Sequence, residues 1–378
     1  MAFTLFGKTL SPDLKFWQKD QRVIGIDIGS SSVKIVQLKK EKEKAILETY
    51  GELATGPYAN RPIGQNAQLS EEAAVSMIMD LAKESGAGAK DAIVSIPVKS
   101  SFLTTIKIPL VEGGKNMNEM IGFEARKYIP VPLNEVDLDW WVLDAGSDET
   151  GEEEQQLLSS GGKTEKKQMV EVLLAAIQRE VIMKYQHIIS KAGMKVKAFE
   201  IEVFSEWRSS IFRQTAPFML IDLGASSTKI SVIDKGALRM THAVDKGGQA
   251  ITTAIANSLK ISFERAEEMK QEIGLSPRPE YREFVNVMET VLSFIFAESK
   301  QMSLAYGRKY GNSVSKIVLI GGGALLKGIT DMAVKNLGVE VSLADPFSKT
   351  EYPLFLQESI KQISPVFAVA TGLAMRDL

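Results

Sequence analysis

The sequence predicts an α/β protein of two lobes, each built around a copy of the same hairpin. Residues 27–35 read DIGSSSVKI and residues 222–230 read DLGASSTKI, and each copy follows an apolar segment typical of a buried strand. A third segment, residues 316–329 (KIVLIGGGALLKGI), predicts a buried strand that runs through three glycines into a helix. Because 378 residues exceed one ordinary domain, we expect the two hairpins to lie in separate lobes.

Both hairpins have the composition of a phosphate-binding turn. Gly29 and Gly224 adopt backbone conformations that other residues avoid, and they let a ligand approach the main chain. Successive amides of such a turn form a concavity for anions, and serine hydroxyls add donors. The turn residues concerned are Ser30, Ser31, Ser32, Ala225, Ser226 and Ser227. Lys34 and Lys229 follow seven residues after the two aspartates, and either lysine reaches a phosphate if the hairpin turns tightly. One such hairpin would be an ordinary turn, whereas two matched copies predict a phosphate site.

The strand ends supply candidate metal and nucleotide contacts. Asp27 and Asp222 end the two apolar strands, where a carboxylate holds magnesium directly or through its water. Gly321, Gly322 and Gly323 leave room for a flat ligand or a phosphate beside a helix N-terminus. The alternative is a glycine-rich turn without a ligand, since the segment matches neither GxxxxGK[ST] nor GxGxxG.

Composition excludes several classes of function. The 45 basic and 47 acidic residues give a net charge of −2, which argues against a nucleic-acid-binding protein. The absence of cysteine excludes disulfides, a thiol nucleophile and cysteine-based zinc sites, and His187 and His242 lack metal-ligand spacing. No apolar run has the roughly 18–20 residues that cross a bilayer. The apolar residues of the N-terminal tail predict a segment that folds onto its own domain or, alternatively, docks on a membrane surface or partner.

Together these motifs resemble those of the actin, Hsp70 and sugar-kinase superfamily. DIGSSSVK resembles its first phosphate motif, DLGASSTK the second, and GGGALLKG the adenosine motif, as in MreB and FtsA. The resemblance implies the two-lobed, ribonuclease H-like actin fold with duplicated βββαβα cores, binding ATP or ADP with magnesium. Residues 266–270 (AEEMK) are similar to a stretch whose Glu and Lys contact ribose, which implies Glu267 and Lys270; the alternative is an exposed salt bridge within a helix. Other implied nucleotide contacts are Gly247, Gly248 and Lys327.

The resemblance also bears on hydrolysis. Actin has a strand ending in Ile-Gln whose glutamine positions the attacking water, and LLAAIQREV implies that role for Gln178; the alternative is an ordinary helix start. The histidine that follows actin's second phosphate motif is missing here, where Lys229 occupies that region. We therefore expect slow or partner-dependent hydrolysis. A sugar kinase would add an aspartate base, for which the sequence offers no clear candidate.

Within this superfamily the sequence resembles the PilM family of type IV pilus assembly proteins. The opening GIDIGSSSVKIVQL and residues 119–140 (EMIGFEARKYIPVPLNEVDLDW) carry the resemblance. It implies a cytoplasmic ATP-binding adaptor at the inner membrane that binds the cytoplasmic N-terminus of PilN near Tyr128, Ile129 and Pro130, and through it PilO and the pilus motor ATPases. The N-terminal tail and the polar segment 146–167 depart from the family pattern.

Two other interpretations stay open. A filament-forming cytoskeletal or cell-division ATPase of the MreB and FtsA class is the main alternative, although FtsA carries a C-terminal amphipathic helix after a linker. A small-molecule kinase is the other. The secretion protein GspL, a relative with a related adaptor role, differs because it continues into a transmembrane helix. The sequence leaves the possibility of a homo-oligomer undecided.

The expected division of the chain follows from these matches. We expect a tail at 1–22, lobe I (subdomain 1A) at 23–98 and 179–212, and an inserted FtsA/PilM-type subdomain 1C at 99–178. Lobe II (2A and 2B) is expected at 213–364, followed by a helix at 365–378 that returns to lobe I. Within the insert, three strands and a helix at 116–128 are predicted, with Trp140 and Trp141 on opposite faces. A helix over residues 70–85 is predicted to begin with Ser70 as its cap.

Overall fold

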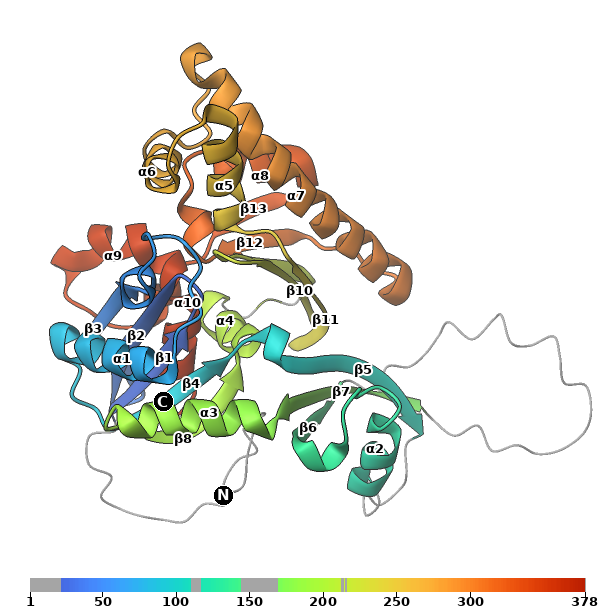
Figure 1. Ribbon diagram of the computed structural model, residues 1–378. Coiled ribbons are helices and arrows are strands. Elements are labelled where there is room, and N and C mark those ends of the chain that lie inside the picture. The colour runs from blue at the N-terminus through green and yellow to red at the C-terminus, as the bar shows by residue number, and fades with distance from the viewer. Residues whose placement is uncertain (1–21, 110–116, 144–168, 212–213, 215, 378) are drawn as a thin grey trace, which may run out of the picture.

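The computed structural model describes residues 22–109, 117–143, 169–211, 214 and 216–377, which form three β-sheets with surrounding helices (Figure 1). Residues 1–21 of the expected N-terminal tail and the polar segment 146–167 lie outside the described residues. Within the described part, no helix combines the length and the apolar character needed to cross a membrane.

Lobe I is a five-stranded sheet whose first three strands are antiparallel and whose last two run parallel to the first. In the order β3-β2-β1-β4-β8, its strands are Lys44–Ala54, Ser32–Glu41, Arg22–Ile28, Asp91–Ile96 and Lys195–Ile201. Helices α1 (Glu71–Ser85) and α3 (Arg179–Lys191) cover one face. The predicted cap of α1 is present, because the Ser70 side chain accepts a hydrogen bond from the Ala73 amide.

Lobe II repeats this sheet in order and direction. In the order β11-β10-β9-β12-β13, its strands are Ala237–Val244, Thr228–Asp234, Phe218–Leu223, Lys316–Ile320 and Glu340–Leu343. Its helices are α5 (Gly248–Leu259), α6 (Phe263–Ile273), α7 (Arg282–Tyr310) and α8 (Ile329–Leu337). The duplication extends to the register, since Asp27 is paired across strands with Lys34 and Asp222 with Lys229. The repeated motif of the sequence therefore reflects two copies of a whole sheet.

The insertion forms a small sheet of its own. It has the order β5-β7-β6, with β5 at Ser101–Pro109, β7 at Met169–Gln178 and β6 at Val136–Val142. Helix α2 (Met117–Ala125) packs on one face of this sheet. Trp140 packs against this core, whereas Trp141 is 50% exposed, as the alternation of strand residues predicts. Strand β5 lies against β11, so the inserted sheet is a neighbour of lobe II (Figure 1).

The chain crosses between the lobes twice. Helix α4 (Glu202–Ser210) follows β8 and leads toward lobe II, and the chain returns after β13 through α9 (Gln357–Ile363) and α10 (Ala368–Ala374). The return comes earlier than the expected boundary at residue 365, because Phe347 and Ile360 already pack against Val36 and Leu38 of lobe I. These apolar side chains cover the second face of the lobe I sheet, which a single final helix would leave partly bare.

Glycines allow the crossing segments to pack at backbone distance. A Cβ at Gly25 of β1 would lie 2.0 Å from the Ala370 carbonyl oxygen, and a Cβ at Gly372 would lie 1.9 Å from that of Ser205. Strand β1, α4 and α10 are therefore held together without intervening side chains. The two crossing helices, α4 and α10, pack on each other, and α10 packs on β1, the strand that leads into the first hairpin.

Candidate functional site

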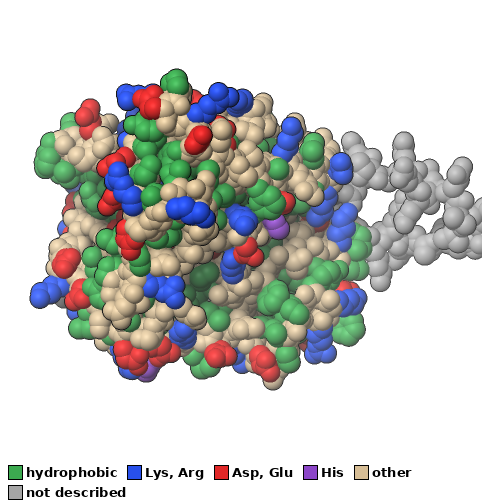
Figure 2. All heavy atoms as spheres, turned by 45° about the horizontal axis from the view of Figure 1, so that its top comes forward, with side chains coloured by type: hydrophobic (Ala, Val, Ile, Leu, Met, Phe, Trp, Pro, Cys, Tyr) green, Lys and Arg blue, Asp and Glu red, His purple; other side chains and the backbone are tan. Residues whose placement is uncertain are grey.

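The two hairpins line one cavity of about 950 Å³ between the lobes. This volume falls within the range of small-molecule sites, about 300–1,000 Å³. The lining includes all the predicted hairpin residues, namely Asp27, Gly29, Ser30, Ser31, Ser32, Lys34, Asp222, Gly224, Ala225, Ser226, Ser227 and Lys229. Acidic and basic side chains are interspersed on the molecular face shown in Figure 2, in keeping with the near-zero net charge.

The tight turns of the two hairpins require their glycines. A Cβ at Gly29 would lie 2.9 Å from the Ser32 carbonyl oxygen, and a Cβ at Gly224 would lie 2.8 Å from that of Ser227. The Gly29 amide donates to the Ser32 oxygen at 3.0 Å, which closes the first turn. The hairpins thus present nearly the same backbone shape to the cavity from opposite lobes.

The predicted ribose and adenosine residues reach the same cavity. Gly247, Gly248, Glu267, Lys270 and the three glycines 321–323 all line it. Lys270 Nζ lies 2.7 Å from Glu267 Oε2, and their side chains are only 14% and 12% exposed, so the pair is largely enclosed. Burial would raise the pKa of Glu267, but Lys270 and hydrogen bonds outweigh it and lower that pKa. Glu267 and Lys270 therefore place a carboxylate and an ammonium group together at the cavity wall.

The three-glycine segment shapes the wall beside Asp222. Gly321 has φ +81°, and a Cβ there would lie 2.2 Å from Asp222 Oδ1, so only glycine fits without displacing that carboxylate. At Gly322, by contrast, a Cβ would meet no atom within 4 Å. The segment therefore passes close to Asp222 and leaves open space at Gly322, as a bound flat ligand or phosphate requires.

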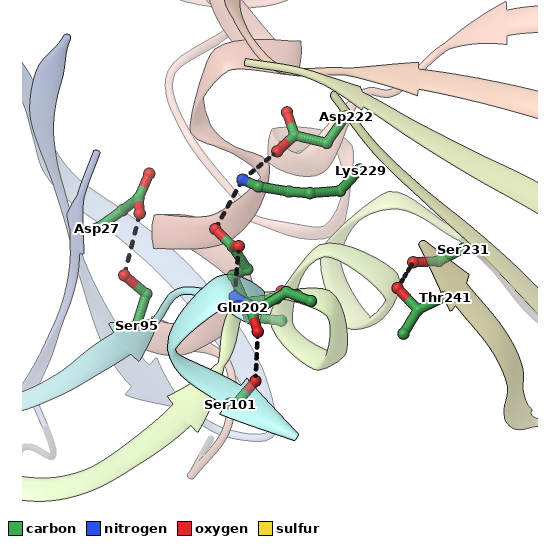
Figure 3. Close-up of polar contacts among 10 residues, drawn as sticks. Asp27, Ser95, Ser101, Glu202, Asp222, Lys229, Ser231 and Thr241 are labelled. Atoms are coloured by element: carbon green, nitrogen blue, oxygen red, sulfur yellow. Dashed lines mark hydrogen bonds and ion pairs between the residues drawn. The ribbon is translucent and has the colours of Figure 1, made fainter. Parts of the chain in front are cut away.

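Lobe II and helix α4 together form a buried acidic cluster around Lys229. Lys229 Nζ lies 2.7 Å from Asp222 Oδ2 and 2.8 Å from Glu202 Oε2 (Figure 3). The other Glu202 oxygen accepts the Val98 amide at 2.8 Å. Glu206 follows one helical turn later, and its Oε1 has no hydrogen-bond partner among the described residues. Oxygens of Glu202, Glu206 and Asp222 lie within 4.8 Å of one another, a donor set that suits a divalent cation.

The electrostatics of this cluster fix the protonation of Lys229. Burial raises the pKa of Glu202, and it raises that of Glu206 well above its usual value. Burial by itself would lower the pKa of Lys229, but Asp222, Glu202 and Glu206 outweigh it and hold that pKa well above normal. Lys229 is therefore a cation that neutralises Asp222 of lobe II and the carboxylates of α4.

The lobe I hairpin has different partners. Asp27 Oδ1 accepts a hydrogen bond from Ser95 Oγ at 3.0 Å (Figure 3), and Lys34 Nζ donates to Ser32 Oγ at 2.7 Å. Lys34 also lies 3.5 Å from Glu52, whose side chain is 39% exposed. The repeated backbone thus carries two unlike electrostatic settings, and the more enclosed charge cluster belongs to lobe II.

Two predicted residues lie away from the cavity, and one important acid was missed. Gln178 ends β7 of the inserted sheet, opposite Val136, and does not line the cavity, so its place does not support a water-positioning role. Lys327 also faces elsewhere and donates to the Glu272 carbonyl oxygen at 2.6 Å. Glu202 occupies the strand-to-helix junction at the cavity, because β8 rather than β7 ends there. The acidic pair Glu202 and Glu206, four residues apart after the apolar strand, was the available signal.

The segment predicted to bind a partner lies on the inserted subdomain. Ile129 is buried in its core, whereas Tyr128 is 51% exposed and Pro130 is also exposed. Nearby in the sequence, Phe123 of α2 is 63% exposed. The insertion therefore presents aromatic side chains to the outside.

Comparison with known proteins places the chain among pilus proteins. The family model described as "Type IV pilus assembly protein PilM" matches residues 25–378. A solved PilM-PilN type IV pilus biogenesis complex is 23% identical, with a TM-score of 0.75 over 94% of this chain and 98% of that one. MreB5 of Spiroplasma citri bound to ADP is 12% identical, with a TM-score of 0.50 over 93% and 94% of the two chains.

Curated relatives include cell division proteins. FtsA of Streptococcus pneumoniae is 28% identical over 194 residues, 46% of this chain and 42% of the relative. FtsA of Bacillus subtilis is 23% identical over 47% of this chain and 45% of the relative. The matched region thus spans less than half of these relatives. The family match and the duplicated sheets agree that this chain has the actin-like fold and belongs to the PilM family of type IV pilus assembly proteins.

Proposed function

We propose that this protein binds ATP or ADP, with magnesium, between its two lobes. The observation that carries the proposal is the pair of matching glycine turns that line one cavity from opposite lobes. In this arrangement the hairpin amides and hydroxyls bind the phosphates, and Gly247, Gly248, Glu267 and Lys270 contact the nucleoside. Support also comes from MreB5, a protein of similar fold whose solved structure holds ADP.

The acidic cluster fits a magnesium ion that accompanies the nucleotide. Asp222 and Glu202 line the cavity and offer carboxylate oxygens, and Asp27 lies across it. Glu206 is close to both but does not itself line the cavity. Magnesium, when bound, would neutralise phosphate charge there. The histidine that follows the second phosphate motif of actin is missing from this chain, where Lys229 occupies that region. We therefore expect at most slow or partner-dependent hydrolysis.

The nucleotide-loaded protein would act as an adaptor of the type IV pilus. We place it on the cytoplasmic side of the inner membrane, where it binds the cytoplasmic N-terminal segment of PilN near the inserted subdomain. Its family and its similarity to the chain solved with PilN support this assignment. The exposed Tyr128 and Pro130 mark the proposed docking region. PilN in turn would connect it to PilO and to the motor ATPases.

A steric block tests the nucleotide site. Gly322→Val would project a side chain into the cavity without an internal clash, because nothing lies within 4 Å of a Cβ at this position. Gly88→Val is the matched control, since Gly88 has equal space around its Cβ but lies outside the cavity. In calorimetric titrations with magnesium and ATP, we expect the wild type and Gly88→Val to bind and Gly322→Val to lose binding. Failure of the wild type to bind ATP or ADP refutes the proposed site.

A second titration tests the adaptor role. A synthetic peptide of the PilN N-terminal segment is titrated into nucleotide-stripped protein, with and without ATP and magnesium. We expect tighter binding with nucleotide, by about fivefold or more if the sites are coupled. Equal affinity for the PilN peptide with and without nucleotide refutes the coupling. Absence of peptide binding in both conditions refutes the adaptor assignment.

Filament formation is the second candidate function. It is favoured by the match to FtsA over about half of the chain and by the fold shared with MreB5. Pelleting and electron microscopy with ATP distinguish the two, because an adaptor stays in the supernatant and a cytoskeletal protein sediments as filaments.

A further inference from the structure

A single carboxylate of the inserted sheet lies between two cations of lobe II. Glu171 stands within β7, and its Oε2 lies 3.6 Å from Arg239 Nη1 of β11. Its Oε1 lies 3.7 Å from Lys309 Nζ near the end of α7. The side chains of Glu171 and Arg239 are only 16% and 7% exposed, so water screens this pair weakly. One residue of the insertion thus contacts two separate elements of lobe II.

The lobe II side of this contact is a braced cluster. The Arg239 guanidinium lies 5.8 Å from the centre of the Tyr310 ring, and Lys309 Nζ lies 4.8 Å from it. Tyr310 packs on Tyr306, whose hydroxyl donates to Asp234 at 2.8 Å. Arg239 Nε is buried without a hydrogen-bond partner in the described residues, so its charge depends on neighbours such as Glu171. The side chains of Arg239 and Lys309 are therefore fixed to lobe II and move with it.

The inserted sheet is joined to lobe I at its other end, beside the cavity. Strand β7 runs directly into α3, and β5 begins just after Val98, whose amide donates to Glu202. One end of the inserted sheet is covalently joined to lobe I, and Glu171 contacts lobe II. A change in the angle between the lobes must therefore move the inserted sheet or break one of these attachments. The inserted sheet also contacts lobe II where β5 lies against β11. A further ion pair between Lys99 and Asp245, whose side chains are 45% and 85% exposed, is correspondingly weak.

We propose that Glu171, held by Arg239 and Lys309, couples the angle between the lobes to the position of the inserted sheet. Nucleotide occupancy would then reach the surface that binds PilN through this contact. The inference rests on the proposed nucleotide function, and it makes Glu171 a positioning residue that touches neither ligand. Since coupling is reciprocal, PilN binding would also alter nucleotide affinity through the same contact.

Hydrogen–deuterium exchange of the full-length protein with and without ATP and magnesium tests this route. In the wild type, we expect nucleotide to change exchange both at the two hairpins and in peptides covering β5 and β7. In Glu171→Gln, which keeps the size of the side chain and removes its charge, the hairpins should respond as before and the inserted sheet should lose its response. Glu340→Gln is the control, because it removes a carboxylate paired with Lys316 inside lobe II at 2.8 Å.

Each outcome decides one claim. Unchanged hairpins in the wild type refute the nucleotide site itself. Changed hairpins with an unresponsive inserted sheet in the wild type, or a full response of that sheet in Glu171→Gln, overturn the coupling role. If Glu171→Gln fails to fold, Lys309→Gln decides, since the Lys309 side chain is 44% exposed and its replacement is mild. A reduced response of the inserted sheet then supports the proposal, and an unchanged response overturns it.

Discussion

Replacing Lys229 with methionine tests the charge balance of the lobe II cluster. The side chains of Lys229, Asp222 and Glu202 are 16%, 9% and 7% exposed, and the lysine bonds both carboxylates at 2.8 Å or less. Methionine keeps most of the apolar stem and removes the ammonium. Two buried carboxylates then lose their counter-charge, with Glu206 close by.

The size of the effect follows from burial. Removing one partner of a buried ion pair costs about 3–5 kcal/mol, since the remaining charge stays buried and uncompensated. For a lobe of 150–250 residues, each kcal/mol lowers the melting temperature by about 2–4 °C. Lys229→Met should therefore lower the melting temperature of lobe II by roughly 6–20 °C at pH 7.5 in nucleotide-free protein.

The matched control is Lys34→Met, the equivalent position of lobe I. Lys34 bonds Ser32 and lies 3.5 Å from the half-exposed Glu52, so its replacement costs about 1 kcal/mol. Differential scanning calorimetry of the two variants compares equivalent sites in one molecule. The larger loss must belong to Lys229→Met.

The deficit should also depend on pH with a definite sign. Burial raises the pKa of Glu202 and of Glu206 above the unfolded value of about 4.3. A group of this kind stabilises the fold below its unfolded pKa, and that contribution is lost as pH rises through its folded pKa. Loss of Lys229 raises these folded pKa values further, so the variant should recover toward the wild type between pH 7.5 and pH 5. A wild-type melting temperature at pH 7.5, or a deficit that grows on acidification, refutes the reasoning.

Three further predictions concern packing, capping and closure. Gly25→Ala should lower stability by roughly 1–3 kcal/mol in urea titrations, because its Cβ would lie 2.0 Å from the Ala370 oxygen; a neutral result contradicts the tight packing of α10 on β1. Ser70→Ala should cost about 1 kcal/mol, and Ser70→Asp should restore most of it, since the cap bond is lost and then replaced. Gln249→Ala should speed ATP release in stopped-flow measurements, because Gln249 Oε1 accepts a hydrogen bond from the main-chain amide of Asn66 in the other lobe at 2.6 Å; an unchanged rate argues against this bridge.

Much of the fold could be predicted from the sequence because the duplication is local. Each hairpin is fixed by an apolar strand, a glycine turn and an alternating second strand within about a dozen residues. The cross-strand pairing of Asp27 with Lys34 and of Asp222 with Lys229 follows from that spacing. The inserted strands and α2 were predicted for the same reason, since their patterns are continuous in the chain.

The rest depended on contacts between distant segments. The sequence places the strand that ends at Gln178 in the insertion, and its likeness to actin suggests a role at the cavity for Gln178. The sheet pairing puts Gln178 opposite Val136, and Gln178 does not line the cavity. Glu202 and Glu206 look like ordinary helix residues until α4 is placed against Lys229. The return at Phe347 was placed too late because no local pattern shows which sheet face those apolar side chains cover.

Because α10 packs on β1, the first strand of lobe I is completed by a helix that is synthesised more than 300 residues later. The strand that presents Asp27 has Gly25 in backbone contact with Ala370, so its support is made after both hairpins and the insertion have left the ribosome. A nascent chain that carries every glycine of the proposed phosphate site still lacks α10, which packs on the strand before the first turn. We therefore expect a chain that lacks α10 to bind nucleotide more weakly than the full chain.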